Sequence, residues 1–161
     1  LMHTINLINK KLSLNILTHD PIEISSELAS KLDLLTEHIL SDQNKHQLAV
    51  NLKLISSKEM IKLNRDFRSK ELDTNVLSFP VGKDIQRISG ELGDIAMSFS
   101  YIQSESQSLN RDLEDHMMHL LAHGILHLLG FDHTEDQDAN IMETQEIEYL
   151  KFFKIANPYL I

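Results

Sequence analysis

Residues 123–133, HGILHLLGFDH, constrain the fold of this 161-residue chain more than any other stretch. On a helix, His123 and His127 lie one turn and about 6 Å apart along the axis, so their side chains can meet one ion. Gly130 is typical of a helix C-terminus, and His133 follows three residues later. The spacing therefore predicts a helix that presents two imidazoles and ends near the glycine, followed by a turn that brings back a third.

Two further histidines, His116 and His119, share the predicted helix face. Along the axis His119 lies about 12 Å from His127, which is too far for both to bind one zinc ion at roughly 2.0–2.1 Å. We therefore expect the third ligand to be His133, from beyond the helix. We interpret His116 and His119 as half-buried helix residues at the edge of a cleft.

The chain has no cysteine, which excludes disulfides, thiolate nucleophiles and cysteine-containing zinc sites. Three neutral imidazoles leave the charge of a divalent ion uncompensated, and an open fourth position would hold water of lowered pKa. We expect zinc as the cofactor, although three imidazoles also suit nickel, cobalt or copper. Such a site favours an anionic substrate, for example a phosphodiester.

The same spacing resembles the metzincin protease pattern H-E-x-x-H-x-x-G-x-x-H. In that pattern the glutamate is the general base beside the metal, whereas position 124 of this chain is glycine. A metal site is therefore expected here without the base that a peptidase needs. A metzincin-like metallopeptidase stays as an alternative.

Hydrophobic periodicity predicts one α+β domain over residues 1–161. Strands are expected at residues 4–8, 49–55, 75–80 and 91–100; residues 12–16 also alternate, which leaves the pairing at this end ambiguous. Helices capped by Asp20, Ser56 and Thr134 are expected to run to about residues 40, 67 and 153, and another helix spans residues 109–130.

Charge is spread unevenly along the chain, whose formal net charge is −9. Residues 132–148 carry seven acidic side chains and no lysine or arginine, whereas residues 62–87 carry six basic against four acidic ones. A polyanion could therefore still meet a locally basic surface. Because no apolar run approaches the ~18 residues of a membrane span, we expect a soluble, cytoplasmic protein without a membrane partner.

Three basic residues, Arg65, Arg68 and Lys70, follow the short helix within NRDFRSKELDTNVLSFP, residues 64–80. A guanidinium suits bidentate contact with phosphate and with charge that builds up on a phosphoryl oxygen. Arginines at helix ends are also common on surfaces. The chemistry of these residues alone therefore leaves open whether Arg68 is functional.

Four stretches, LNRDFR…K, TNVLSFP, ELGDIAMS and HLLAHGILHLLGFDH, occur in the order and spacing of the YbeY family, and the chain resembles this family over residues 60–150. These proteins are bacterial metal-dependent endoribonucleases of rRNA maturation. The resemblance implies that His123, His127 and His133 match the zinc ligands and that Arg68, rather than Arg65, matches the essential arginine. It also implies a small mixed four-stranded sheet flanked by helices, with the metal-binding helix lining a cleft.

The function that the resemblance implies is cleavage of single-stranded RNA, and not DNA, in maturation of the 3′ end of 16S rRNA and in ribosome quality control, in association with the small ribosomal subunit. The zinc ion would act on the scissile phosphodiester while Arg68 neutralises charge on its non-bridging oxygens. Asp132 is expected to cap the loop or orient a ligand. A non-catalytic, ribosome-associated zinc module is the second alternative.

The chain departs from the family pattern in two places. Asp73 stands where the family usually has proline, and it places a negative charge near the expected phosphate path. Phe131 stands where tyrosine is common. Neither position is an expected metal ligand.

Overall fold

A computed structural model describes residues 2–5 and 12–160 of the chain, in eleven helices and strands. The strands are β1 (Met2–Ile5), β2 (Leu14–His19), β3 (Ala49–Ile55), β4 (Val76–Pro80) and β5 (Glu91–Ser98). The helices are α1 (Ser26–Asp42), α2 (Ser57–Arg68), α3 (Lys83–Ser89), α4 (Phe99–Ser108), α5 (Leu113–Leu128) and α6 (Asp136–Phe152). Among these residues no helix combines the length and the apolar character needed to cross a membrane.

The described strands form one sheet in the order β1-β2-β3-β5-β4. The inner pairs β2/β3 and β3/β5 are parallel, whereas β1/β2 and β4/β5 are antiparallel. The predicted α+β class with a mixed sheet is confirmed, and the sheet has one strand more than expected because residues 14–16 of the ambiguous stretch 12–16 belong to β2. Residues 6–8 of the first predicted strand lie outside the described residues.

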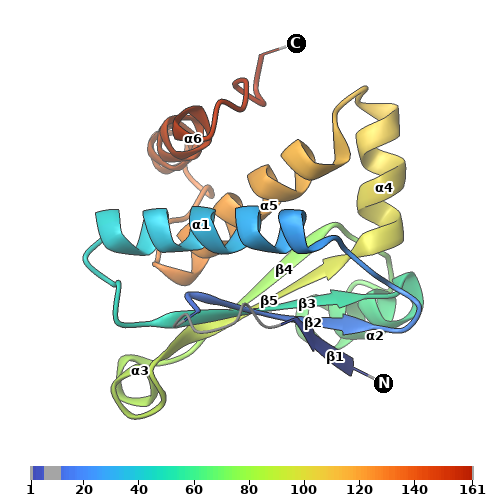
Figure 1. Cartoon of the computed structure of the whole chain (residues 1–161), viewed down its shortest axis with the longest axis horizontal. Coiled ribbons are helices and arrows are strands. Elements are labelled where there is room, and N and C mark those ends of the chain that lie inside the picture. Colours follow the sequence, from blue (N-terminus) through green and yellow to red (C-terminus); the bar gives the residue numbers. More distant parts are fainter. Residues whose placement is uncertain (1, 6–11, 161) are drawn as a thin grey trace.

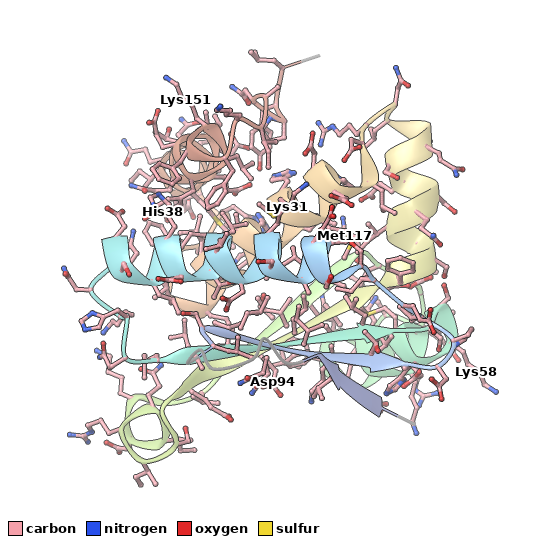
Figure 2. All side chains as sticks on the ribbon, in the orientation of Figure 1. Lys31, His38, Lys58, Asp94, Met117 and Lys151 are labelled. Atoms are coloured by element: carbon pink, nitrogen blue, oxygen red, sulfur yellow. The ribbon has the colours of Figure 1, made fainter. Side chains whose placement is uncertain are left out.

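The two faces of the sheet differ because side chains alternate along each strand. Leu52, Leu54 and Ile95 belong to the main core beneath α1 and α5, which lie together on one face (Figure 1). On the other face α2 covers only a small second cluster. Figure 2 shows Asp94 on this second face, on the opposite side of the sheet from α1, where it forms an ion pair with Lys53.

The first helix begins later than predicted. Its N-cap is Ser25, whose hydroxyl accepts a hydrogen bond from the Leu28 N–H at 3.0 Å, and not Asp20. Asp20 lies in a turn, because the Ile22 N–H donates to the His19 carbonyl at 2.8 Å. The proline that follows Asp20 therefore belongs to this turn and not to the first turn of a helix.

The expected helix over residues 109–130 is shorter than predicted, and a separate helix precedes it. The chain leaves β5 directly into α4, turns at Asn110 with a φ of 52°, and begins α5 after Asp112. The Asp112 carboxylate caps α5 by accepting from the Asp115 N–H at 3.0 Å. Helix α3, in a segment expected to be a loop, and helix α4 were both missed, and the last helix is preceded by Glu135 and not by Thr134.

Candidate metal centre and the cleft around it

Helix α5 lies directly against β4 and β5 because Gly124 has no side chain. A Cβ at this position would lie 2.9 Å from Ile95 Cδ1 and 3.2 Å from Ser78 Oγ. The Ser78 hydroxyl also donates to the Gly124 carbonyl at 3.1 Å. His123 and His127 lie on the face of α5 adjacent to Gly124. The close approach at Gly124 therefore places both histidines at the edge of the sheet beside β4.

The turn at Gly130 ends α5 as predicted and has a φ of 101°. The Gly130 N–H donates to the His127 carbonyl and the Phe131 N–H donates to the Leu126 carbonyl, which is the hydrogen-bond pattern of a Schellman motif. Phe131 packs against the main core. The turn therefore directs the following residues back along the helix, and His133 reaches the two helix histidines.

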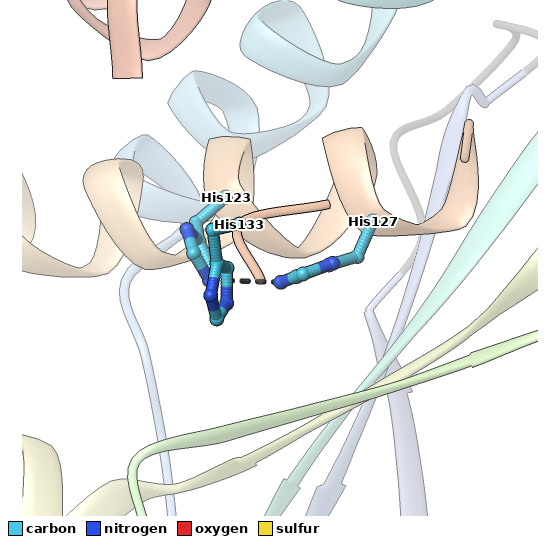
Figure 3. Close-up of side chains that lie close together, drawn as sticks. All are labelled: His123, His127 and His133. Atoms are coloured by element: carbon cyan, nitrogen blue, oxygen red, sulfur yellow. Dashed lines mark hydrogen bonds between the residues drawn. The ribbon is translucent and has the colours of Figure 1, made fainter. Parts of the chain in front are cut away.

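The structure brings His123, His127 and His133 together (Figure 3). One ring nitrogen from each lies within 4.8 Å of the others. The Nε2 atoms of His123 and His127 are 3.1 Å apart, and the His133 ring lies 5.4 Å from the His123 ring and 4.8 Å from the His127 ring between centroids. These three residues are a candidate metal site.

Hydrogen bonds to the second nitrogens define which nitrogens face the centre. His127 Nδ1 lies 3.1 Å from the Phe131 carbonyl oxygen, which can only accept, so Nδ1 carries the proton. His123 Nδ1 lies 3.1 Å from a carboxylate oxygen of Glu146 and likewise donates. With Nδ1 engaged on both rings, the two Nε2 atoms face each other across 3.1 Å, where one metal ion can accept both lone pairs. The donor set therefore fits a divalent transition metal.

Burial favours the neutral, metal-binding form of His127. Burial first, and then the proximity of His123 and His133, lower the pKa of His127 below its ordinary value of 6.5. The ring therefore stays neutral at pH 7, so a metal ion does not have to compete with a proton there.

Glu146 is a buried residue of the site that the sequence analysis missed. Its side chain is only 1% exposed, and it contacts His119 Nε2 and the Tyr159 hydroxyl at 2.7 Å as well as His123. Burial raises the pKa of its carboxyl, but hydrogen bonds from His119, His123 and Tyr159 outweigh burial and lower that pKa to about 2. A signal existed, because Glu146 occupies a core position of α6 between Met142 and Leu150.

His116 and His119 do not line the cleft as expected. His116 is buried and pairs with Glu105 at 2.7 Å, and His119 points to Glu146 and Tyr159. Both line a different cavity, between the start of α5 and the C-terminal segment. Asp132 caps the loop, since its carboxylate accepts from the His133 N–H at 2.7 Å and from the Thr134 hydroxyl at 3.2 Å.

The three histidines open onto a cleft of about 440 Å³ that is also lined by the end of α2 and by β4. Residues 74–78 and Pro80 line it from β4 and the loop before it, and Phe67 and Arg68 line it from the end of α2. Phe67 is 53% exposed and its ring centroid lies 4.4 Å from that of Phe79. This cleft brings the predicted arginine and the predicted histidines to one place.

Arg68 and Arg65 differ in what they contact. Arg65 Nε lies 3.1 Å from an oxygen of Asp66, and Arg65 does not line the cleft. Arg68 is exposed and, within residues 2–5 and 12–160, has no hydrogen-bond or ion-pair partner. The Asp73 carboxylate accepts from the Thr74 N–H at 2.9 Å and is not part of the cleft lining. Arg68 is therefore the guanidinium available to a ligand of this cleft.

Comparison with known proteins gives concordant matches. The protein-family model for the endoribonuclease YbeY matches residues 15–154. Two relatives named endoribonuclease YbeY align with this chain over 156 residues, which are 92% of it. The protein from Francisella tularensis subsp. tularensis (strain FSC 198) is 37% identical over 90% of its own length. The protein from Francisella tularensis subsp. novicida (strain U112) is 36% identical over 93% of its own length. A solution structure of a Thermotoga maritima protein has the same fold, with a TM-score of 0.62 and 27% identity over 86% of this chain and 87% of its own.

Proposed function

Because the chain belongs to the YbeY endoribonuclease family, we propose that it hydrolyses phosphodiester bonds of single-stranded RNA in this cleft. The observation that carries the proposal is the convergence of His123, His127 and His133 on a cleft that is also lined by Arg68, whose guanidinium has no partner in the described part of the chain. In this proposal residues 1–161 are one metal-dependent hydrolase domain, and the three histidines hold one zinc ion. Bound by three imidazoles, zinc supplies Lewis-acid chemistry at its open coordination position.

Arg68 is the proposed catalytic side chain. Its fork of N–H donors can bind two phosphoryl oxygens and stabilise the negative charge that grows on them during cleavage. Because it has no partner among the described residues, no existing ion pair must be broken when a phosphate binds. His127 Nδ1 donates to the Phe131 carbonyl and His123 Nδ1 donates to the Glu146 carboxylate, so the Nε2 atoms of both rings stay directed at the centre.

Phe67 favours a single-stranded substrate. An exposed aromatic ring beside a phosphate-binding arginine can stack on an unpaired base, whereas bases of a duplex are already stacked on each other.

By family resemblance we propose that the substrate is 16S rRNA near its 3′ end, that the protein acts in the cytoplasm on the small ribosomal subunit, and that it contributes to ribosome quality control. DNA is not the expected substrate.

The two alternative functions have less support. A peptidase of the metzincin type needs a carboxylate at position 124, where even a Cβ would crowd Ile95 and Ser78. A structural zinc module usually has four protein ligands, and the candidate group within the described residues has three. Both observations favour a site that leaves a coordination position for substrate.

The test combines metal analysis of the purified protein with cleavage of matched single-stranded and duplex RNA. We expect one zinc ion per chain and cleavage of the single strand, both lost in His127→Ala, with chelator-treated protein restored by Zn²⁺. Cleavage that persists in His127→Ala would contradict the metal-dependent mechanism. Casein cleavage by zinc-loaded protein without RNA cleavage would favour the peptidase, and metal binding without either activity would favour the structural module.

A further inference from the structure

We propose that Glu146 is a positioning residue of the metal centre, whose carboxylate holds the His123 ring with Nε2 directed at His127 and His133. This inference rests on the metal site of the proposed function. It assigns a role to the α6 helix, which otherwise contributes no residue to the lining of the cleft.

Both oxygens of Glu146 are engaged by separate groups. Oε1 accepts from His119 Nε2 and from the Tyr159 hydroxyl, each at 2.7 Å, and Oε2 accepts from His123 Nδ1 at 3.1 Å. Because an ionised carboxylate can only accept, His123 must carry its proton on Nδ1. That leaves Nε2 as the nitrogen of His123 with a free lone pair, and Nε2 is the atom that faces His127.

Glu146 is a buried carboxylate that is stabilised by hydrogen bonds and has no lysine or arginine partner among the described residues. A buried carboxylate is costly unless it is paired with a positive charge. Within the described residues its ion-pair contacts are His119 and His123, and no lysine or arginine pairs with it. A divalent ion on the far side of the His123 ring would supply the missing positive charge, and Glu146 in turn would make His123 a more basic ligand.

A second glutamate–histidine pair, the partly exposed Glu105 and the buried His116, lacks these features and serves as a control. Its contacts converge on one oxygen, Oε1, which lies 2.7 Å from His116 Nε2 and 3.0 Å from Asn75 Nδ2. Neither Glu105 nor His116 contacts one of the three histidines of the centre within hydrogen-bond distance among the described residues. A glutamine at 105 can offer the same oxygen to both donors, so the substitution removes the charge and retains the contacts.

The test measures Zn²⁺ affinity by competition with a chromophoric chelator for wild type, Glu146→Gln and Glu105→Gln. The glutamine keeps the size of Glu146 but removes its charge whichever way the amide is oriented. We expect roughly 10–100-fold weaker Zn²⁺ binding in Glu146→Gln, with wild-type affinity in Glu105→Gln. Wild-type affinity in Glu146→Gln, or an equal loss in Glu105→Gln, would overturn the proposal.

A second measurement does not depend on the variants folding. In metal-free wild-type protein, the ¹⁵N resonances of His123 should report a proton on Nδ1, and an Nδ1 without a proton would overturn the proposal. Wild-type protein that fails to bind Zn²⁺ would overturn the proposed function together with this role, whereas wild-type affinity in Glu146→Gln removes only the role of Glu146.

Discussion

The two sides of the cleft are built in opposite ways. The α5 side carries His123 and His127, whose second nitrogens are each bound to a fixed acceptor, the Glu146 carboxylate and the Phe131 carbonyl. The α2 side carries Phe67 and Arg68, which are both exposed. The guanidinium of Arg68 has no partner within the described residues. The histidine nitrogens are held by hydrogen bonds made on folding, whereas the Arg68 guanidinium has no polar partner in the described part of the chain until a substrate enters.

This difference separates metal binding from substrate binding. Ligand atoms that are held by hydrogen bonds lose little freedom when an ion binds, so the α5 side supports affinity and geometry. An arginine without a partner among the described residues can adjust to a flexible strand of RNA, and the exposed Phe67 ring, which packs against Phe79, can stack on a base. Substitutions on the α5 side should therefore alter metal content, and substitutions on the α2 side should alter turnover or RNA binding at constant metal content.

The largest effect is expected for Arg68→Ala. Loss of a group that stabilises charge in the transition state should lower kcat by about 10²–10³-fold, with zinc content unchanged. Arg68→Lys should recover only part of the activity because lysine lacks the planar fork. Arg65→Ala is the matched control, since Arg65 pairs with Asp66 outside the cleft, and its activity should stay near wild type. Loss of zinc from Arg68→Ala would contradict the conclusion that the α2 side does not contribute to metal binding.

A smaller effect is expected for Phe67→Ala. Loss of one stacked base should weaken binding of single-stranded RNA by about 1–3 kcal/mol, which raises KM more than it lowers kcat. Phe67→Trp should retain binding because the larger ring still stacks. Fluorescence anisotropy with a labelled oligonucleotide on zinc-free protein measures the change, and equal binding by wild type and Phe67→Ala would remove Phe67 from the RNA-binding surface.

On the α5 side, Gly124→Ala should destabilise the fold by about 1–3 kcal/mol through overpacking. The added methyl group would lie 2.9 Å from Ile95 Cδ1, so the cost should be smaller in an Ile95→Val background, which lacks that atom. Urea unfolding of the four proteins in this double-mutant cycle gives the cost of Gly124→Ala in the wild-type background and in the Ile95→Val background. Strict additivity of the two substitutions would show that the contact with Ile95 is not the source of the cost.

The smallest expected effect is on the pH dependence of stability, and it involves His116 of α5, which lines a different cavity from the three histidines. Burial lowers the pKa of His116 below 6.5, although its hydrogen bond to Glu105 opposes this. The unfolded chain therefore binds more protons than the folded one below that pH, and metal-free protein should lose stability as pH falls below 6.5, by at most about 1.4 kcal/mol per pH unit for one histidine. Urea unfolding at pH 7.5 and 5.5 measures this, and unchanged stability would contradict it. Arg68 keeps its charge throughout.

The meeting of the three histidines was predictable because it depends on local geometry. A helix repeat places His123 and His127 on one face, and a glycine stop returns the chain toward His133. Both features are set by residues within one short stretch. The position of Arg68 beside them was not predictable from chemistry, because it depends on how α2 and α5 pack around β4, and only the resemblance to a family pointed to it.

The parts of the fold that were missed lack such local signals. Helix α3 is short and has no buried residue among those described, so it has no apolar periodicity to detect. The first helix was placed too early because Asp20 and Pro21 suit a helix start and a turn equally well. Glu146 was overlooked for a different reason: its spacing from Met142 and Leu150 marks a core position of α6, but it lies among several acidic residues, and its role depends on partners from α5 and on Tyr159.

The contact between Gly124 and the strands has a consequence for how wide the cleft is. The Ser78 hydroxyl donates to the Gly124 carbonyl and Ser78 also lines the cleft, so the spacing between the histidine-bearing helix and β4 is set where the bare backbone of Gly124 meets the Ser78 and Ile95 side chains. A larger residue at this position would lift the two ligands away from β4 together, without altering their distance from each other. The dimension that a substrate meets, therefore, can be changed by a substitution that leaves the spacing of the metal ligands intact.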